Sequence, residues 1–385
     1  MANPQDNRPD IPPALQALRD RIDAVDLDMV DLLASRNALI AEVAAVKRST
    51  GVPIKDAGRE DELLTARREK AQSLGLSPDT VEGLFRLLLR ASRDTQATLR
   101  AAVPEDLRLC TVAIIGANGG MGRLWTQILQ TVGHDVLAVD LDTTLSATDA
   151  AANADVVLVA VPIDVTEDII VQVGPAMRND ALLTDITSVK ARPVEAMLQH
   201  FEGAVIGTHP LFGPSVRSLQ NQRMAFVTAR DVNSWAQWLN TTYAALGLTV
   251  LHTDADTHDR IMGVVQVLTH HSTEVMGRAM RALGVSVEDT LQFTSPVYRM
   301  ELLMTARHFA QDADLYRAIE AGNPNCAAVT EAFRRASDEF STALTTGDDA
   351  GFRTMFAEVR DYLGPFAEGA LEQSGALIER LVEME

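Results

Sequence analysis

The chain has 385 residues, a formal net charge of −19, and a composition that is 46% hydrophobic and 23% charged. The acidic balance disfavours nucleic acid as a partner. No apolar run reaches the ~18 residues that span a bilayer, which disfavours a membrane protein. Two cysteines, Cys110 and Cys326, give no disulfide framework. The polar N-terminus has no signal-peptide pattern, so we expect a cytoplasmic protein of two or three domains.

Residues 14–100 have a helical pattern. Apolar residues recur at three- and four-residue steps from Leu15 to Val43, and no Gly or Pro occurs between Pro13 and Gly51. This predicts one helix over 14–48, roughly 50 Å long. After a turn at 50–53, a second helix is expected over 56–74 and a third over 79–99. A long helix with two short partners leaves its apolar stripe uncovered, which predicts a homodimer.

Three cations lie beside this apolar stripe: Arg19, Arg36 and Lys47. Burying a cation is costly unless an anion meets it, so the set predicts a pocket for a small polyanion. Residues 1–100 contain 15 Lys and Arg against 16 Asp and Glu, a net charge of −1, and the remainder therefore carries −18. Taken singly, each cation is equally consistent with a solvated helix surface.

The pattern changes after residue 100. Residues 101–109 indicate a linker, and β-branched runs then alternate with amphipathic helical stretches, as in a parallel sheet covered on both faces. The expected strands cover 111–115, 136–140, 156–161, 182–187, 204–208 and 225–228. From His258 onward only helices are predicted, with breaks at Gly284, Pro296, 322–324, Gly347 and Gly364.

The expected fold is therefore multidomain, α and α/β. An all-helical domain covers 1–100 and a linker covers 101–109. A Rossmann-type, doubly wound parallel sheet covers 110–257, and a second all-helical domain covers 258–385.

The strand expected at 111–115 ends in a glycine-rich turn typical of dinucleotide sites. In the pattern G-x-G-x-x-G, Gly119 and Gly122 are the second and third glycines, whereas Ala117 replaces the first. Asp140, 18 residues after Gly122, would accept the ribose hydroxyls and repel a 2′-phosphate, which favours NAD over NADP. The expected cofactor-binding residues are Gly116, Ala117, Gly119, Gly120, Met121, Gly122, Asp140, Val161 and Pro162. A tight glycine turn without a ligand is the alternative.

The N-terminal polar residues resemble, position by position, the active site of the all-helical chorismate mutases. The resemblance is carried by the runs LRDRID (18–23), ASRN (34–37), VK (46–47), PIKDAGRE (53–60) and SRDTQ (92–96). It implies that Lys47 and Gln96 are catalytic and donate to the ether oxygen of chorismate. It also implies that Arg19 reaches in from the partner subunit. The implied substrate-binding residues are Arg19, Arg36, Asp56, Arg59, Glu60 and Ser92.

The rest of the chain resembles prephenate dehydrogenases. The matching runs are VPIDVTE (161–167), TDITSVK (184–190), GTHPLFGP (207–214), QVLTH (266–270), SPVYRMEL (295–302) and FAQDADLY (309–316). Over almost its full length the chain thus resembles the bifunctional chorismate mutase–prephenate dehydrogenase family of tyrosine biosynthesis. The resemblance implies two substrates, chorismate and prephenate. It also implies NAD, a homodimer that uses the C-terminal helical domain, and tyrosine as a possible feedback ligand.

The expected catalytic residue of the second half is His209, just after a strand. A histidine with a near-neutral pKa suits acceptance of the substrate's hydroxyl proton. His270 is expected to contact substrate, with His271 as the competing candidate. Ser188 and Lys190 end a strand and are expected to face the cleft. By resemblance, Arg307 binds a substrate carboxylate, Arg299 supports it, and Tyr316 is linked to tyrosine binding. No metal site is expected.

Two positions depart from the family pattern. Thr269 stands where the family often has Arg, and Thr257 stands where it usually has an acid. Two other functions stay open on the sequence. The second half could be an arogenate dehydrogenase, or the first half could be a silent mutase domain that senses aromatic metabolites. A generic β-hydroxyacid dehydrogenase shares the sheet-plus-helices plan but leaves residues 14–100 unexplained.

Overall fold

The computed structural model describes residues 12–50, 56–99, 107–216 and 218–382, without the side chains of 48–50, 57, 94 and 96–99. These residues form two compact units. The first takes the described residues up to Arg108 with those of 215–223 and 237–250, and the second takes the others. None of the described helices is both long and apolar enough for a bilayer span. The bounds of the four segments given above stay a prediction, and most of the expected linker lies outside the described residues.

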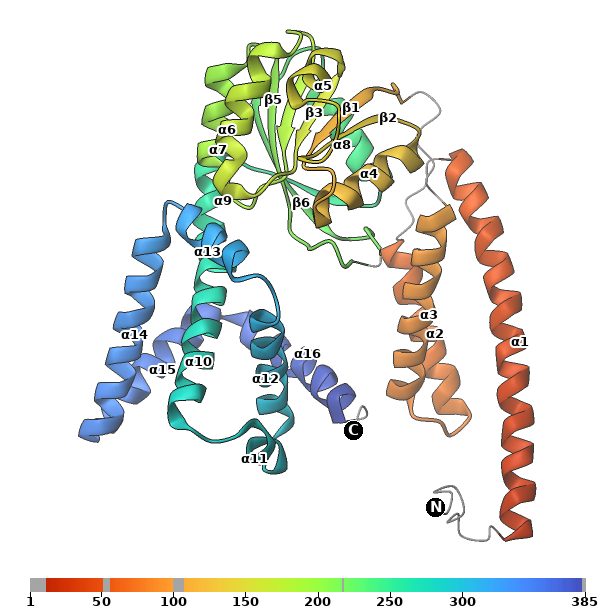
Figure 1. Cartoon of the computed structure of the whole chain (residues 1–385). Coiled ribbons are helices and arrows are strands. Elements are labelled where there is room, and N and C mark those ends of the chain that lie inside the picture. The colour runs from red at the N-terminus through yellow and green to blue at the C-terminus, as the bar shows by residue number, and fades with distance from the viewer. Residues whose placement is uncertain (1–11, 51–55, 100–106, 217, 383–385) are drawn as a thin grey trace, which may run out of the picture. The chain divides into compact units, whose positions relative to one another are not determined.

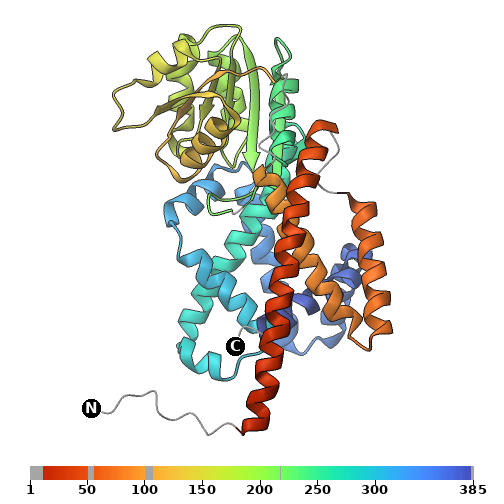
Figure 2. The ribbon, with the colours of Figure 1, turned by 90° about the vertical axis from the view of Figure 1, so that its right-hand side faces the viewer.

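The first unit contains the three predicted helices. They are α1 (Pro13–Thr50), α2 (Ala57–Ser73) and α3 (Pro78–Leu99). Asp56 begins α2 as its N-cap, because its side chain accepts a hydrogen bond from the Arg59 amide. The helix α3 packs on both α2 and α1, and α1 extends past both of them at its N-terminal end (Figures 1 and 2).

The helix α1 has a largely uncovered apolar face. Ala44 on α1, with Leu64 and Ala71 on α2, is buried. In contrast, Ile22 and Val25 in the N-terminal half of α1 are 59% and 58% exposed. Exposed apolar area of this extent is unusual for a monomer. It agrees with the expected second copy of the chain.

The second unit contains most of a seven-stranded sheet in the order β2-β1-β3-β4-β5-β6-β7 (Figure 1), from which Arg223 of β6 and Thr249 and Val250 of β7 are grouped with the first unit. Its strands are β1 (Thr111–Ile115), β2 (Asp135–Val139), β3 (Val156–Val159), β4 (Leu182–Asp185), β5 (Ala204–Pro210), β6 (Arg223–Arg230) and β7 (Thr249–His252). The first five are parallel, as expected. The strand β6 runs antiparallel to β5, which was not expected, and β7 was not predicted.

Helices cover both faces of this sheet. They are α4 (Gly120–Val132), α5 (Ala147–Asn153), α6 (Ile163–Val173), the 3₁₀ turn η1 (Gly174–Ala176), α7 (Ala191–His200) and α8 (Trp235–Ala245). With right-handed crossovers, the strand order puts α4 on one face and α5, α6 and α7 on the other. Accordingly, α6 packs on both α5 and α7. The order reverses between β1 and β3, and the carboxyl ends of these two strands therefore open a crevice.

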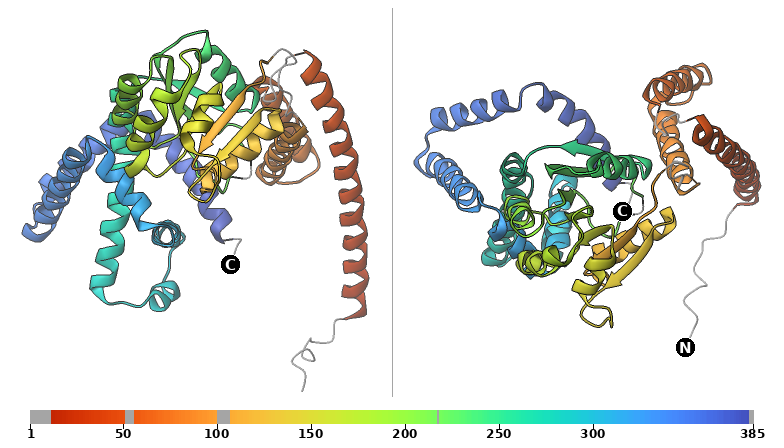
Figure 3. Two further views of the ribbon diagram at one scale, coloured as in Figure 1. Left: turned by 45° about the horizontal axis from the view of Figure 1, so that its top comes forward. Right: turned by 90° about the horizontal axis from the view of Figure 1, so that it is seen from above.

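Residues 255 to 382 are helical apart from short connections, in agreement with the helices predicted from 258 onward. The elements are α9 (Ala255–Met262), the π-helical turn η2 (Gly263–Leu268), α10 (Thr269–Leu283), α11 (Val287–Gln292), α12 (Pro296–Phe309), α13 (Ala313–Gly322), α14 (Cys326–Thr346), α15 (Asp349–Leu363) and α16 (Pro365–Val382). The helix α13 packs on α6, and α10 packs on α12. The last three helices pack in succession, and α16 returns to α12 (Figure 3).

Candidate active sites

The first candidate site lies where α1, α2 and α3 meet. Arg36 on α1 donates to Ser92 Oγ on α3 at 2.5 Å. Ser92 in turn donates to the Leu88 carbonyl and is buried. The structure thus brings together two of the predicted substrate-binding residues and holds the Arg36 guanidinium in one orientation. A guanidinium fixed in this way can bind a carboxylate through two parallel hydrogen bonds.

A carboxylate–guanidinium pair lies beside this contact. Arg93 Nη1 on α3 lies 2.7 Å from both carboxylate oxygens of Glu60 on α2, and both side chains are 19% exposed. Glu60 was predicted to bind substrate, whereas Arg93 was not singled out. The pair joins α3 to α2, whereas Ser92, the residue before Arg93 in the chain, joins α3 to α1.

The other predicted mutase residues are more dispersed. Asp56 caps α2, and Arg59 is exposed and 3.5 Å from Glu62. Arg36 and Lys47 are eleven residues apart on α1, which puts them on one face about 16 Å apart along the axis. Arg19 is exposed, roughly 25 Å along the axis from Arg36, so α1 does not bring the two together. The side chain of Gln96 lies outside the described residues.

The second candidate site begins with the glycine turn after β1. At Gly122, a Cβ atom would lie 2.0 Å from the Gly116 carbonyl oxygen, so α4 can approach the turn only without a side chain. Gly116 has a φ of +93°, and its own Cβ would meet the Ala160 carbonyl oxygen at 2.6 Å. No described side chain caps α4, which begins after Gly119. Its first amides can therefore bind an anion such as a pyrophosphate.

Asp140 follows β2 at the same edge of the sheet. Its Oδ2 accepts from the Asn118 amide at 2.8 Å, and its Oδ1 accepts from the Leu141 amide at 2.8 Å. The carboxylate is thus fixed beside the glycine turn, where it can still accept from the hydroxyls of a ribose. Val161 lies against Gly116, and Pro162 precedes the first residue of α6. The residues present therefore fit a dinucleotide such as NAD.

Lys190 corrects one sequence expectation. The sequence predicted that this side chain faces the cleft, but it is fully buried, and its ammonium group bonds Asp185 and Thr187. The physical reason is the buried carboxylate of Asp185 at the end of β4, which requires a cation. Burial lowers the pKa of Lys190, and the charge of Asp185 partly offsets this effect. Ser188, two residues earlier, is partly exposed at the same strand end.

His209 ends β5 in a buried chain of polar groups. Its Nδ1 lies 3.0 Å from Nε2 of His258 on α9, and His258 Nδ1 lies 2.8 Å from Oδ1 of Asp259. Asp259 also accepts from the amides of Lys190 and Ala191 at 2.8 and 2.9 Å. Burial lowers the pKa of His209 well below 6.5, and the charges of His258 and Lys190 add to this effect. A neutral His209 is able to accept a proton.

A cluster of aromatic rings lies on the C-terminal helices. The ring of His270 is 4.8 Å from Tyr316 and 5.7 Å from His308, measured between centroids. Burial, with the charge of His308, lowers the pKa of His270 to about 4, although Glu274 opposes the shift. Arg307 is exposed on α12, and its charge lowers the pKa of Tyr316, which burial raises overall. The predicted His270, Arg307 and Tyr316 are thus brought together.

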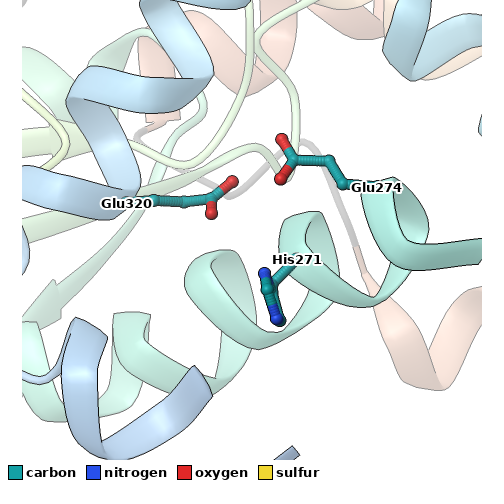
Figure 4. Close-up of side chains that lie close together, drawn as sticks. All are labelled: His271, Glu274 and Glu320. Atoms are coloured by element: carbon teal, nitrogen blue, oxygen red, sulfur yellow. The ribbon is translucent and has the colours of Figure 1, made fainter. Parts of the chain in front are cut away.

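His271, the competing candidate, lies near the same two carboxylates as the His270 cluster, because His270 Nδ1 is 4.0 Å from Glu320 Oε1 and His308 Nε2 is 3.2 Å from Glu274 Oε1. The ring of His271 lies 5.4 Å from Phe333, and its ligand atoms lie within 4.8 Å of those of Glu274 and Glu320. Figure 4 shows the two carboxylates turned toward each other. Burial and the neighbouring Glu274 raise the pKa of Glu320 to about 7, so a shared proton can hold this pair together. That no metal binds here stays a prediction.

The remaining predicted positions lie on α9, α10 and α12. Arg299 is half-buried on the first turn of α12. Thr257 donates its amide to Asp254, which caps α9, so this departure from the family pattern serves a helix start. Thr269 is exposed at the start of α10.

Three family models match the chain in succession. They are "Chorismate mutase type II" at residues 18–97, "Prephenate dehydrogenase, nucleotide-binding domain" at 130–246, and "Prephenate dehydrogenase, dimerization domain" at 254–358. The T-protein of Enterobacter agglomerans is 35% identical over 94% of this chain and 97% of its own length. The T-protein of Haemophilus influenzae is 34% identical over 95% and 97%.

The chain belongs to the T-protein family. It joins a chorismate mutase domain to the two domains of a prephenate dehydrogenase, as in this family of bifunctional enzymes of tyrosine biosynthesis. The second half also has the fold of a solved prephenate dehydrogenase from A. aeolicus, which was crystallised with hydroxyphenyl propionate and NAD⁺. The TM-score is 0.56 at 18% identity, over 66% of this chain and 97% of that one.

Sequence reasoning missed the polar partners of the predicted residues. Arg93 lies in the run SRDTQ, and its position directly after the predicted site residue Ser92 was the feature that could have identified it. His258 and Asp259 directly follow Thr257 in the chain but were not singled out as site residues. Their signal was the adjacent His-Asp pair near a helix start, but nothing local says that the pair meets His209, 49 residues away.

Proposed function

We propose that this chain rearranges chorismate to prephenate in its N-terminal helical unit. We further propose that it oxidatively decarboxylates prephenate to 4-hydroxyphenylpyruvate with NAD in its second unit. One observation carries the proposal. A single chain carries both sets of residues. One set is the Arg36–Ser92 contact with the Glu60–Arg93 pair. The other is the buried neutral His209 near a strand end, with the glycine turn after β1 in the same sheet.

The first reaction needs no acid, base or nucleophile. The protein must hold chorismate in a compact conformer and stabilise the charge that develops on its ether oxygen. Arg36, with Arg19 of a second subunit, would bind the two carboxylates, while Lys47 and Gln96 would donate to the ether oxygen. Glu60 and Asp56 would hold the substrate hydroxyl, and Arg59 and Ser92 would complete the polar shell.

The second reaction needs a proton acceptor, a clamp for carboxylates and a hydride acceptor. NAD, when bound, supplies the hydride acceptor. His209 would take the hydroxyl proton. Arg307 and His270 would bind the carboxylate side of prephenate, with Arg299 in support, and Ser188 would contact substrate at the strand end. Lys190 is buried with Asp185, so we assign it to holding this strand end in shape.

The cofactor preference follows from charge. Asp140 offers a carboxylate where the adenosine ribose would lie, and a 2′-phosphate at this place would be repelled. We also propose a cytoplasmic homodimer, in line with the dimerization-domain match and the exposed apolar face of α1. Tyrosine is proposed as a feedback ligand near Tyr316.

The test uses chorismate and NAD⁺ with the purified chain, following NADH formation without any added mutase. The expected result is NADH formation from chorismate and from prephenate. In the Arg36→Ala variant only prephenate should give NADH. In the His209→Asn variant chorismate should be consumed and prephenate should accumulate. Turnover of arogenate but not prephenate would overturn the second assignment, and failure to consume chorismate would overturn the first.

A further inference from the structure

We propose that His258 and Asp259 are positioning residues that fix the tautomer of His209, leaving the lone pair of His209 Nε2 free to accept the substrate's proton. This inference rests on the proposed dehydrogenase function. It adds to that function the two residues that prepare the base before substrate arrives.

The first step concerns Asp259. Its Oδ1 accepts from the Lys190 amide at 2.8 Å, and its Oδ2 accepts from the Ala191 amide at 2.9 Å. Burial alone would raise the pKa of Asp259, but the hydrogen bonds from His258 and from these two amides outweigh it, and the net effect lowers the pKa. The side chain is 1% exposed, so solvent does not compete for it. Asp259 is therefore an ionised acceptor with a fixed orientation.

The second step concerns His258. Its Nδ1 lies 2.8 Å from Oδ1 of Asp259. An ionised carboxylate can only accept, so His258 Nδ1 must carry the hydrogen. In the neutral imidazole the other nitrogen, Nε2, is then an acceptor. This Nε2 is the atom that faces His209, at 3.0 Å.

The third step concerns His209. Because His258 Nε2 accepts, His209 Nδ1 must donate, and its Nε2 is left without a hydrogen. The planes of the two rings lie at 74° to each other, edge to face, so the rings are not stacked and a ring nitrogen of one points toward the other. His209 would thus be held in the Nδ1–H tautomer, with Nε2 as the base.

The same chain of bonds assists when the proton moves. As the substrate's O–H bond breaks and the Nε2–H bond forms, His209 would become a cation. The oxygen's electron pair would form the new C=O bond as the C–H bond on the same carbon breaks, with its hydride passing to the acceptor that NAD, when bound, supplies. His209 is faced by His258 on α9 and by Lys190, whose charge disfavours this cation. The Lys190 ammonium is itself paired with Asp185. Asp259, bonded through His258, is the anion that stabilises the imidazolium.

Asp259 also has a structural role, which is separate from the proposed effect on His209. Asp259 already ties α9 to the start of α7 through the Lys190 and Ala191 amides, and Asn323 bonds its carbonyl. That function needs no hydrogen bond between His258 and His209. Variants that keep the Asp259 contacts but alter the acceptor presented to His209 therefore separate the two roles.

Steady-state kinetics with prephenate and NAD⁺ provide the first test, on the full chain. His258→Gln offers an amide nitrogen to Asp259 and an oxygen to His209, so kcat should stay within about tenfold of wild type. His258→Phe has a ring but no acceptor, and kcat should fall roughly 100-fold with little change in KM. Asp259→Asn should also lower kcat, because His258 can then reverse its tautomer. The chorismate mutase rate of each variant checks folding.

Nitrogen-15 NMR of the histidine side chains provides the second test and needs no turnover. The His209 signals are assigned by their loss in His209→Asn. The expected result is the Nδ1–H tautomer in wild type and the Nε2–H tautomer in Asp259→Asn. The buried His134, which accepts from the Cys110 amide, gives a matched control, and His134→Gln should leave both the tautomer and kcat unchanged.

The outcomes separate the two claims. If His258→Phe keeps wild-type kcat while His209→Asn loses it, or if His209 is found as the Nε2–H tautomer in wild type, the positioning role is wrong and the dehydrogenase function stands. If His209→Asn oxidises prephenate normally, the proposed base is wrong, and the positioning role falls with it.

Discussion

The guanidinium of Arg93 binds both carboxylate oxygens of Glu60 at 2.7 Å, one residue away from the serine that holds Arg36. Two successive residues of α3 thus bind side chains of the two other helices, Ser92 that of Arg36 on α1 and Arg93 that of Glu60 on α2. A hydrogen bond that involves charged partners contributes about 1.5–3 kcal/mol when it is shielded from water. The Glu60–Arg93 pair therefore affects both the stability of the contact between the helices and its charge.

We expect Arg93→Met to lower the mutase kcat/KM by about tenfold or more, because the Glu60 carboxylate then loses the partner that fixes its orientation. The free energy of unfolding should fall by about 1 kcal/mol, since both side chains are 19% exposed. Dehydrogenase turnover with prephenate should not change. Arg86→Met is the matched control, because its pair with Glu82 is on the surface, with Arg86 64% exposed. Equal loss of mutase activity in both variants would contradict the role of Arg93.

Gly119 and Gly122 make a matched pair in the glycine turn. A Cβ at Gly122 would lie 2.0 Å from the Gly116 carbonyl oxygen, whereas at Gly119 the distance is 3.3 Å. We expect Gly122→Ala to unfold the second unit at a temperature lower by several degrees, and Gly119→Ala to cost much less. If NAD approaches the backbone at Gly119, the second variant should still lose affinity for NAD. Calorimetry measures the change in unfolding temperature, and NAD titration measures the change in affinity.

The buried pair of Lys190 and Asp185 should matter for folding. Lys190→Met leaves a buried carboxylate without its cation, a change that typically costs about 3–5 kcal/mol. The double variant Asp185→Asn with Lys190→Met removes both charges and should recover much of this loss. Denaturant unfolding followed by tryptophan fluorescence measures both. A single variant as stable as wild type would show that the pair is dispensable.

His209 sets the expected pH dependence of dehydrogenation. A histidine accepts a proton only when neutral, and burial lowers the pKa of His209 well below 6.5. The protonated, inactive form therefore becomes populated only at lower pH than for a free histidine. With prephenate, kcat/KM should stay level as the pH falls through 6.5. The profile is best measured in Glu320→Gln, because the pKa of Glu320 is raised to about 7. A midpoint at 6.5 in that variant would contradict a buried, neutral base.

Local patterns predicted most of the fold. The apolar period and the absence of Gly and Pro predicted α1 (Pro13–Thr50), and the glycine turn with Asp140 predicted a dinucleotide site at the ends of the first two strands. The strand β7 was missed because it has only four residues and its exposure follows no alternating pattern. The direction of β6 depends on the neighbour it pairs with, which the run itself does not encode.

The predicted site residues were harder to place than the elements. Lys190 was expected in a cleft, but its burial depends on Asp185 from the preceding strand. The contact of His209 with His258 joins residues 49 positions apart, beyond the reach of any helical or strand period. By contrast, His270 and Tyr316 had both been predicted from two separate runs that resemble the family, and the structure brings their rings into contact.

The π-helical turn η2 (Gly263–Leu268) joins α9, which carries the buried His258, to α10, which carries His270 and His271 in its first turn. Such a turn amounts to one extra residue in a regular helix. Deleting one residue there would turn α9, which carries His258, by about 100° relative to α10, which carries His270 and His271. A length change of one amino acid would thus change the orientation of His258 relative to the His270–His271 pair, although α9 and α10 would each keep their own helical structure.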